Sequence, residues 1–218
     1  MTANETVFLF PKNDTWISEA DQGLNYGASP TIEIQNKNLE NKNGLIVFDL
    51  TPFSGKTVVK ASMYMHVESG VGNNAVVNAY PIITNIWNEG NGNGTSGFPN
   101  WISAQSGQNW VAAGGGFYNG VVGTLDTEIS GYRVMDLNLL GMQFAIDWPS
   151  SNLGMLLKGT AASANEKIVI TSKEGAVSQR PYLVLEFESD PNTSVCNCLL
   201  YTSPSPRDAT LSRMPSSA

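Results

Sequence analysis

The sequence has little of the residue types that mark several other classes of protein. Of its 218 residues, 14% are charged, one is a histidine and two are cysteines. It contains no run of about 18 apolar residues, so it predicts no membrane-spanning helix. The net charge is −7 and no basic stripe is visible, which argues against nucleic acid as a partner.

Residues suited to catalysis are also scarce. The single histidine, His66, has no serine or cysteine motif nearby, so we expect it to be a solvent-facing strand residue. Neither a G-x-x-x-x-G-K-[ST] phosphate loop nor a zinc-ligand spacing occurs. Among the 19 acidic residues, the sequence marks no pair for glycoside hydrolysis. We therefore expect no enzymatic activity.

Turn-forming residues, by contrast, are abundant. The chain has 21 glycines and 11 prolines, a balance typical of a protein built from strands and loops. Its length suits one all-β domain, since sandwiches commonly reach this size. We expect a jelly-roll β-sandwich over residues 5–188, with one short helix.

The stretch from Gly44 to Val67 is the clearest part of this pattern. The apolar run that starts at Gly44 and ends at Phe48 predicts a strand covered on both faces. From Ala61 to Val67, apolar residues occupy every second position, which predicts a half-buried strand with one wet face. Two strands of different burial, joined by a Pro/Gly loop, favour a sandwich.

Other short apolar or alternating runs predict the remaining strands. Leu137 to Trp148 is the one helical candidate, with Leu140, Phe144 and Trp148 on one face and Pro149 ending it. The further strands are expected within residues 5–10, 15–18, 31–35, 75–83, 121–134, 154–158, 167–171 and 181–187.

Gly90 to Gly120 interrupts the pattern with a long, glycine-rich, aromatic segment. Loops of this length are uncommon in compact domains and usually have a function. Flat aromatic rings stack on sugar rings, and neighbouring amides bind hydroxyls, so we expect a ligand-binding surface here. A loop that folds back to bury its own aromatics is the alternative. The candidate binding residues are Trp101, Trp110, Tyr118, Asn100, Gln105 and Asn109.

The other three tryptophans, Trp16, Trp87 and Trp148, lie in periodic segments and are expected in the core. A structural calcium ion is a further possibility, because oxygen ligands occur within or beside loops. The weak candidates are Asp14, Asp21, Asn25 and Asp49, for which turn capping is the alternative. No other cofactor is expected.

The order of several motifs resembles the DNRLRE, or disaggregatase-related, domains, which are grouped with carbohydrate-binding modules. The matching segments are DTWIS (14–18), NYGASPTIEI (25–34), GLIVFDL (44–50), VKASMYMHV (59–67), VNAYPIITNIWNEG (77–90), LGMLLKG (153–159) and RPYLVLEF (180–187). The resemblance covers about residues 5–188 and implies a secreted or surface-displayed, non-catalytic jelly roll. One departure is the segment after WNEG, which is longer and richer in glycine here.

Two functions follow from these observations. The first is a non-catalytic module that binds a polysaccharide or a cell-surface glycan. The second is a structural or adhesive protein of a phage particle, with other virion proteins as partners. The N-terminus, MTANETVFLFPKND, shows no secretory signal, which favours the second function. The expected location is extracellular or in the virion.

The C-terminal residues have a different character. Cys198 to Asp208, CLLYTSPSPRD, resembles a translated sequencing-library adapter, and Ser212 to Ala218 resembles the adapter that follows it. We expect the natural sequence to stop near Asn197 in a metagenomic fragment, with a linker starting at residue 189. Cys196 alone cannot form an internal disulfide.

Residues 198–218 have no apolar periodicity, so we predict that they are disordered and dispensable. Deleting them should leave the melting temperature unchanged within about one degree, because no packed side chain is lost. Differential scanning calorimetry of the full and shortened chains measures this. A fall of many degrees would show that the segment is part of the fold.

Overall fold

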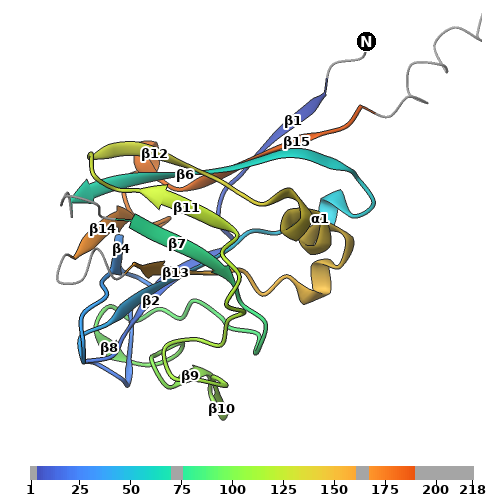
Figure 1. Cartoon of the computed structure of the whole chain (residues 1–218). Helices are drawn as coiled ribbons and strands as arrows, with labels where there is room; N and C mark the ends of the chain where they lie inside the picture. The colour runs from blue at the N-terminus through green and yellow to red at the C-terminus, as the bar shows by residue number, and fades with distance from the viewer. Residues whose placement is uncertain (1–3, 70–75, 161–166, 190–218) are drawn as a thin grey trace, which may run out of the picture. The chain divides into compact units, whose positions relative to one another are not determined.

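The computed structural model describes residues 4–69, 76–160 and 167–189 of the chain. The residues from Glu5 to Glu188 form one compact unit, to which the following description applies. The expected adapter segment, Cys196 and nearly all of the expected linker lie outside the described residues. All strand pairs in the described part are antiparallel, and the strands form a sandwich (Figure 1).

Two sheets make up the sandwich. Sheet 1 has six strands: β1 (Glu5–Leu9), β15 (Tyr182–Phe187), β6 (Val58–Ser69), β12 (Gly131–Asp136), β14 (Ile168–Thr171) and β4 (Thr31–Ile34). Sheet 2 has five strands in the order β11 (Gly123–Asp126), β7 (Val76–Pro81), β13 (Met155–Gly159), β5 (Lys42–Val47) and β2 (Asn13–Ser18). The chain changes sheet repeatedly, for example from β5 to β6 and from β6 to β7, as a jelly roll requires. The all-β sandwich expected from the sequence is confirmed.

The long strand β6 organises sheet 1. It pairs with β12 along one edge, and with β15 and then β14 along the other. Its inward residues Ala61, Met63, Met65 and Val67 are all buried, as their alternation predicts. They pack against apolar residues of sheet 2, and this contact forms the main core between the two sheets.

Strand β5 is covered on both faces, also as predicted. Ile46 belongs to the main core, whereas its neighbour Leu45 points the opposite way, into a second apolar cluster. Both side chains are fully buried. Sheet 2 is therefore the middle layer of three, because residues 82–118 cover its outer face (Figure 1).

The covering segment, residues 82–118, contains little regular structure. Its strands are β8 (Thr95–Ser96), β9 (Ser103–Gln105) and β10 (Gln108–Asn109), and β8 pairs with β3 (Leu24–Asn25). We call this segment the cover. It departs from sheet 2 after β7 and returns to it at β11, next to β7.

The single α-helix, α1 (Leu139–Asp147), lies inside the expected range. Asn138 caps it, since its Oδ1 accepts a hydrogen bond from the backbone N–H of Gly141 at 3.1 Å. Met142 and Ile146 are its buried residues. Leu140, Phe144 and Trp148 are instead 82%, 60% and 61% exposed, so the expected core position of Trp148 is wrong.

Three 3-10 turns complete the described structure: η1 (Thr51–Phe53), η2 (Pro149–Ser151) and η4 (Val177–Gln179). Among the described residues, no helix is long and apolar enough to cross a membrane.

The two cores lead to a prediction about neighbouring residues of β5. Leu45→Ala and Ile46→Ala should each lower the free energy of unfolding by about 2–5 kcal/mol, because each removes a fully buried side chain. Urea denaturation of the two variants measures these losses. If Leu45→Ala is as stable as the unaltered chain, the cover does not pack on sheet 2.

Candidate functional site

The cover carries all six binding residues expected from the sequence, and it buries the two tryptophans among them. Trp101 and Trp110 are 7% and 5% exposed and pack with Trp87 and Leu156 in the second cluster. The indole N–H of Trp110 donates to the carbonyl of Asn100 at 2.8 Å. The expected stacking platform is therefore not formed by these two rings: the loop folds back on itself.

Close packing explains the glycines of the cover. Gly114 has a φ of +92°, and a Cβ at this position would lie 2.8 Å from the ring of Trp101. Its carbonyl accepts a hydrogen bond from Nδ2 of Asn43 at 2.9 Å, which ties the cover to β5. Here glycine permits the approach of a ring and a backbone rather than free bending.

The amides expected beside the rings have local partners. Asn100 is buried, and its Oδ1 accepts from the backbone N–H groups of Ile102 and Ser103. Gln105 donates to Gln108 at 2.7 Å across the β9–β10 turn. Asn109 is exposed and accepts from the Ser103 hydroxyl at 2.7 Å. These contacts shape the turn, and the structure does not group the amides around an exposed ring.

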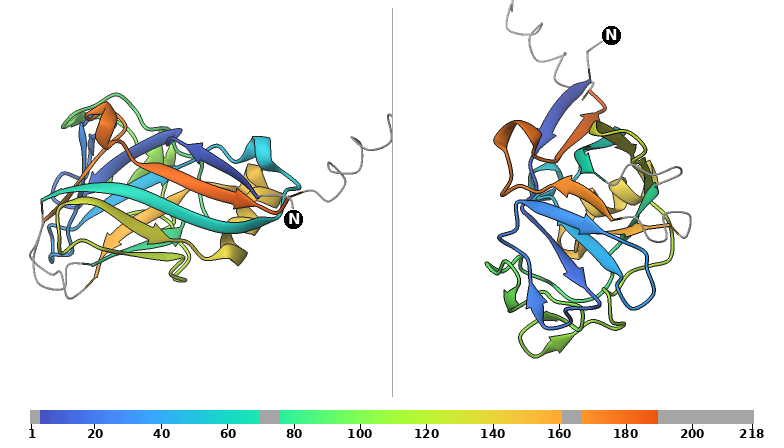
Figure 2. Two further views of the ribbon diagram at one scale, coloured as in Figure 1. Left: turned by 90° about the horizontal axis from the view of Figure 1, so that it is seen from above. Right: turned by 90° about the vertical axis from the view of Figure 1, so that its left-hand side faces the viewer.

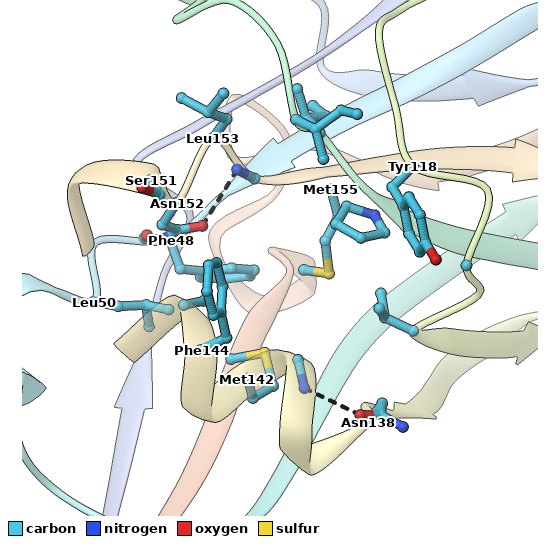
Figure 3. A pocket seen from close by; sticks show the side chains of 18 of the residues that line it. Phe48, Leu50, Tyr118, Asn138, Met142, Phe144, Ser151, Asn152, Leu153 and Met155 are labelled. Atoms are coloured by element: carbon cyan, nitrogen blue, oxygen red, sulfur yellow. Dashed lines mark hydrogen bonds between the residues drawn. The ribbon is translucent and has the colours of Figure 1, made fainter. Parts of the chain in front are cut away.

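Tyr118, the last residue of the cover, is the predicted ring that is exposed, at 63%. It lines a groove of about 790 Å³ between α1 and the end of sheet 2 (Figure 3). Phe144, Met142 and Met155 also line this groove, which is mostly apolar. Asn152, one of its few polar residues, bonds the backbone of Phe48 and Gly154.

A second exposed surface was missed from the sequence. Among the described residues, no segment as long as the cover lies over the outer face of sheet 1 (Figure 2, left), although η4 contacts it at Tyr132 and His66. Aromatic side chains from adjacent strands form a row on this face. We call it the aromatic face; it comprises Phe8 of β1, Tyr182 of β15, Tyr64 and His66 of β6, and Tyr132 of β12.

The rings of the aromatic face contact one another. Tyr64 and Tyr182 stack in parallel, with centroids 4.7 Å apart and planes 4° from parallel. Phe8 and Tyr132 flank Tyr182 at 6.3 Å and 5.8 Å, and His66 meets the edge of Tyr132 at 5.4 Å. Phe8 is 65% exposed and Tyr132 is 43% exposed, while Tyr64 and Tyr182 are half-buried.

Hydroxyls and polar groups accompany these rings. Tyr132 donates to the carbonyl of Ser178 at 2.9 Å, which fixes its ring. Burial raises the pKa of Tyr182, and the charge of neighbouring Tyr64 raises it further.

His66 lies on the outer face, as expected, and contacts Thr171 and Gln179 at 3.2 Å and 3.3 Å.

An acidic cluster lies apart from these surfaces. It unites Asp14 of β2, Glu89 of the cover and Glu174, which follows β14. Burial raises the pKa of Asp14 to about 8, the backbone N–H of Lys173 opposes this rise, and repulsion from Glu174 and Glu89 adds to it. Burial likewise raises the pKa of Glu89, although Lys173 counteracts it.

Of the four calcium candidates, Asp14 alone belongs to this cluster. Asp21 accepts hydrogen bonds from Ser18 and Tyr26. Asn25 is buried and bonds the backbone of Glu89, Pro99, Gly27 and Gly92, and Asp49 accepts from the backbone N–H of Thr51. The hydrogen bonds of these three residues hold local turns and contacts between loops.

With this geometry established, the sequence comparisons can be placed on the structure. Residues 5–94 match the model of carbohydrate-binding module family 96, a region that runs from β1 to the residue before β8. No curated protein matches the chain. The match supports a carbohydrate-binding module, a class that is generally non-catalytic and often extracellular, and it is compatible with the DNRLRE resemblance.

The two tryptophans and the groove tyrosine should respond differently to substitution. Trp110→Ala should lower the free energy of unfolding by about 3–5 kcal/mol, because a large buried ring is lost. Tyr118→Ala should change it by no more than about 0.5 kcal/mol, because the ring is exposed. Chemical denaturation compares them; equal stability of both variants would contradict the burial of Trp110.

Proposed function

We propose that the domain binds a polysaccharide or surface glycan through the aromatic face, without catalysing a reaction. The observation that carries this proposal is the row of rings on the outer face of sheet 1. An antiparallel sheet that faces water normally presents polar residues there. A contiguous aromatic surface left uncovered is instead typical of a binding site.

The shape of the aromatic face suits an extended sugar chain. The outer residues of paired strands point the same way, so Tyr182 and Tyr64, which are direct partners across β15 and β6, stand side by side. Phe8 and Tyr132 extend the row to the neighbouring strands β1 and β12. The row thus crosses four strands, long enough to contact more than one sugar ring.

The chemistry of the rings also suits sugars, which have apolar ring faces and polar hydroxyl edges. Phe8 and Tyr132 offer exposed ring surface for stacking. The hydroxyls of Tyr64 and Tyr182 make no hydrogen bond to another described residue, so both are free to bond a sugar hydroxyl. By comparison, the groove beside α1 offers few free polar groups, which makes it less suitable.

The charges around the aromatic face favour a neutral glycan. Glu186 pairs with Lys60 at 3.3 Å, and Asp136 accepts from Ser62 at 2.7 Å near the same row. The chain as a whole carries a net charge of −7. The carboxylate of Asp136 and the negative net charge both oppose an anionic polymer, whereas Lys60 balances Glu186.

A glycan array on the intact chain, followed by titration of the strongest neutral hit, tests this function. Tyr182→Ala and Tyr64→Ala should each weaken binding roughly 5- to 150-fold, since losing a stacked ring costs about 1–3 kcal/mol. Tyr182→Phe keeps the ring and removes the hydroxyl, so it should lose less. Circular dichroism confirms that each variant is folded.

Tyr118→Ala and Phe144→Ala serve as matched controls, because they remove exposed rings from the groove instead. We expect both to bind the glycan as the unaltered chain does. If the groove variants lose binding and the aromatic-face variants keep it, the site is the groove. If no glycan binds at all, the proposed function itself fails.

The second candidate function is a structural or adhesive protein of a phage particle. The apolar groove beside α1 favours it, since Leu140 and Phe144 there suit contact with an apolar segment of another virion protein. The gene neighbourhood distinguishes the two functions. Tail genes alongside would support the virion protein, whereas a lyase or hydrolase domain in the same reading frame would support the module.

A further inference from the structure

Three carboxylates from distant parts of the chain converge at one end of the sandwich. One carboxylate oxygen each of Asp14, Glu89 and Glu174 lies within 4.8 Å of the others. Asp14 belongs to sheet 2, Glu174 follows a strand of sheet 1, and Glu89 belongs to the cover. The cluster therefore joins all three layers of the domain.

The hydrogen bonds of Asp14 leave one oxygen unsatisfied. This side chain is 1% exposed, and its Oδ2 accepts from the backbone N–H of Lys173 at 2.8 Å. Its Oδ1 is buried and has no hydrogen-bond partner among the described residues. A buried carboxylate oxygen without a partner is unfavourable, so we expect a cation or a hydrogen-bond donor to lie next to Oδ1.

The charges of the cluster are also unbalanced. The ammonium group of Lys173 contacts Glu89 at 2.6 Å and Glu174 at 2.8 Å, and it neutralises one of the three carboxylates. Its side chain is 25% exposed, on a long flexible stem that can turn toward solvent. The backbone N–H of Asp14 donates to Oε1 of Glu89 at 3.1 Å, which holds that side chain close to Asp14.

We propose that Asp14, Glu89 and Glu174 bind a divalent cation, calcium in preference to magnesium, with Lys173 displaced from the cluster. The two positive charges of the cation would take the place of the ammonium group and favour the ionised form of Asp14. All three ligands supply oxygen, which calcium prefers, and no histidine or cysteine of the described residues joins the cluster. Calcium tolerates irregular ligand arrangements and water ligands, whereas magnesium needs a near-ideal octahedron.

The role of this cation is structural. It would bind one group from sheet 2, one from the segment that follows β14 of sheet 1 and one from the cover, and so hold the three layers together at this end. The proposal does not depend on sugar binding, because the cluster and the aromatic face share no residue.

The test uses the full chain, first treated with EDTA, and then titrated with CaCl₂ or MgCl₂ by calorimetry. One calcium site should appear, with weaker binding of magnesium. Calcium at about a hundredfold above its dissociation constant should raise the melting temperature by about 5–10 °C. No heat and no change in melting temperature up to about 10 mM calcium, above the range of weak extracellular sites, would overturn the proposal.

Substitutions then locate the site. Glu174→Gln is chosen because Glu174 is partly exposed and its loss leaves the core intact; it should weaken calcium binding by at least ~10-fold. Glu33→Gln is the control, since Glu33 also pairs with lysines, Lys42 and Lys167, but lies outside the cluster. Equal calcium affinity of the two variants would contradict the assignment.

The variant Lys173→Met tests whether calcium or the ammonium group of Lys173 balances the charge of the carboxylates. If calcium is the natural counter-charge, this variant should be destabilised in EDTA, restored by calcium, and bind calcium at least as tightly as the unaltered chain. If Lys173 alone balances the carboxylates, calcium will not restore the stability, and the proposal is wrong.

Discussion

The burial of sheet 2 on both faces is the constraint on which the rest of the structure depends. An antiparallel sheet in a two-layer sandwich has one wet face, and its strands alternate apolar and polar residues. In this domain Leu45 and Ile46 are adjacent, equally buried and directed to opposite sides. The cover must therefore stay packed on sheet 2, and its tryptophans are the side chains that fill the contact.

The two sheets therefore differ in the exposure of their outer faces. Because the cover occupies the outside of sheet 2, the outside of sheet 1 is the face that the described residues leave largely open, and on which we propose that the ligand binds (Figure 2, left). The aromatic face lies there on four neighbouring strands with regular pairing. Side chains on paired strands are held more rigidly than those on a loop, which suits a preorganised binding surface.

The sequence predicted what periodicity can encode. The alternation in β6, the two-sided burial of β5 and the single helix all followed from the spacing of apolar residues. The packing of the cover was harder to predict, because a loop has no sequence period. The exposure of the helix face was also harder to predict, because an apolar stripe does not reveal whether another segment covers it. The stripe of Leu140, Phe144 and Trp148 is a case in which nothing in the described structure buries the side chains.

The candidate sites show the same limit. Asp14 was recognised as a possible ligand, but Glu89 contacts it across 75 residues and Lys173 across 159, a proximity that only the fold creates. The aromatic face did leave a signal, since Tyr64, Tyr132 and Tyr182 occupy outward positions of alternating strands. A search for large apolar residues on the wet side of each strand would have found it.

The distribution of aromatic residues has a spectroscopic consequence. Four of the five tryptophans, Trp16, Trp87, Trp101 and Trp110, are buried in the two cores, and Trp148 lies at the end of α1. The aromatic face contains tyrosine and phenylalanine but no tryptophan. Emission from the four buried tryptophans therefore reports on the integrity of the cores, whereas occupation of the aromatic face would register in the tyrosine absorption bands. The domain thus carries separate optical reporters for folding and for its exposed surface.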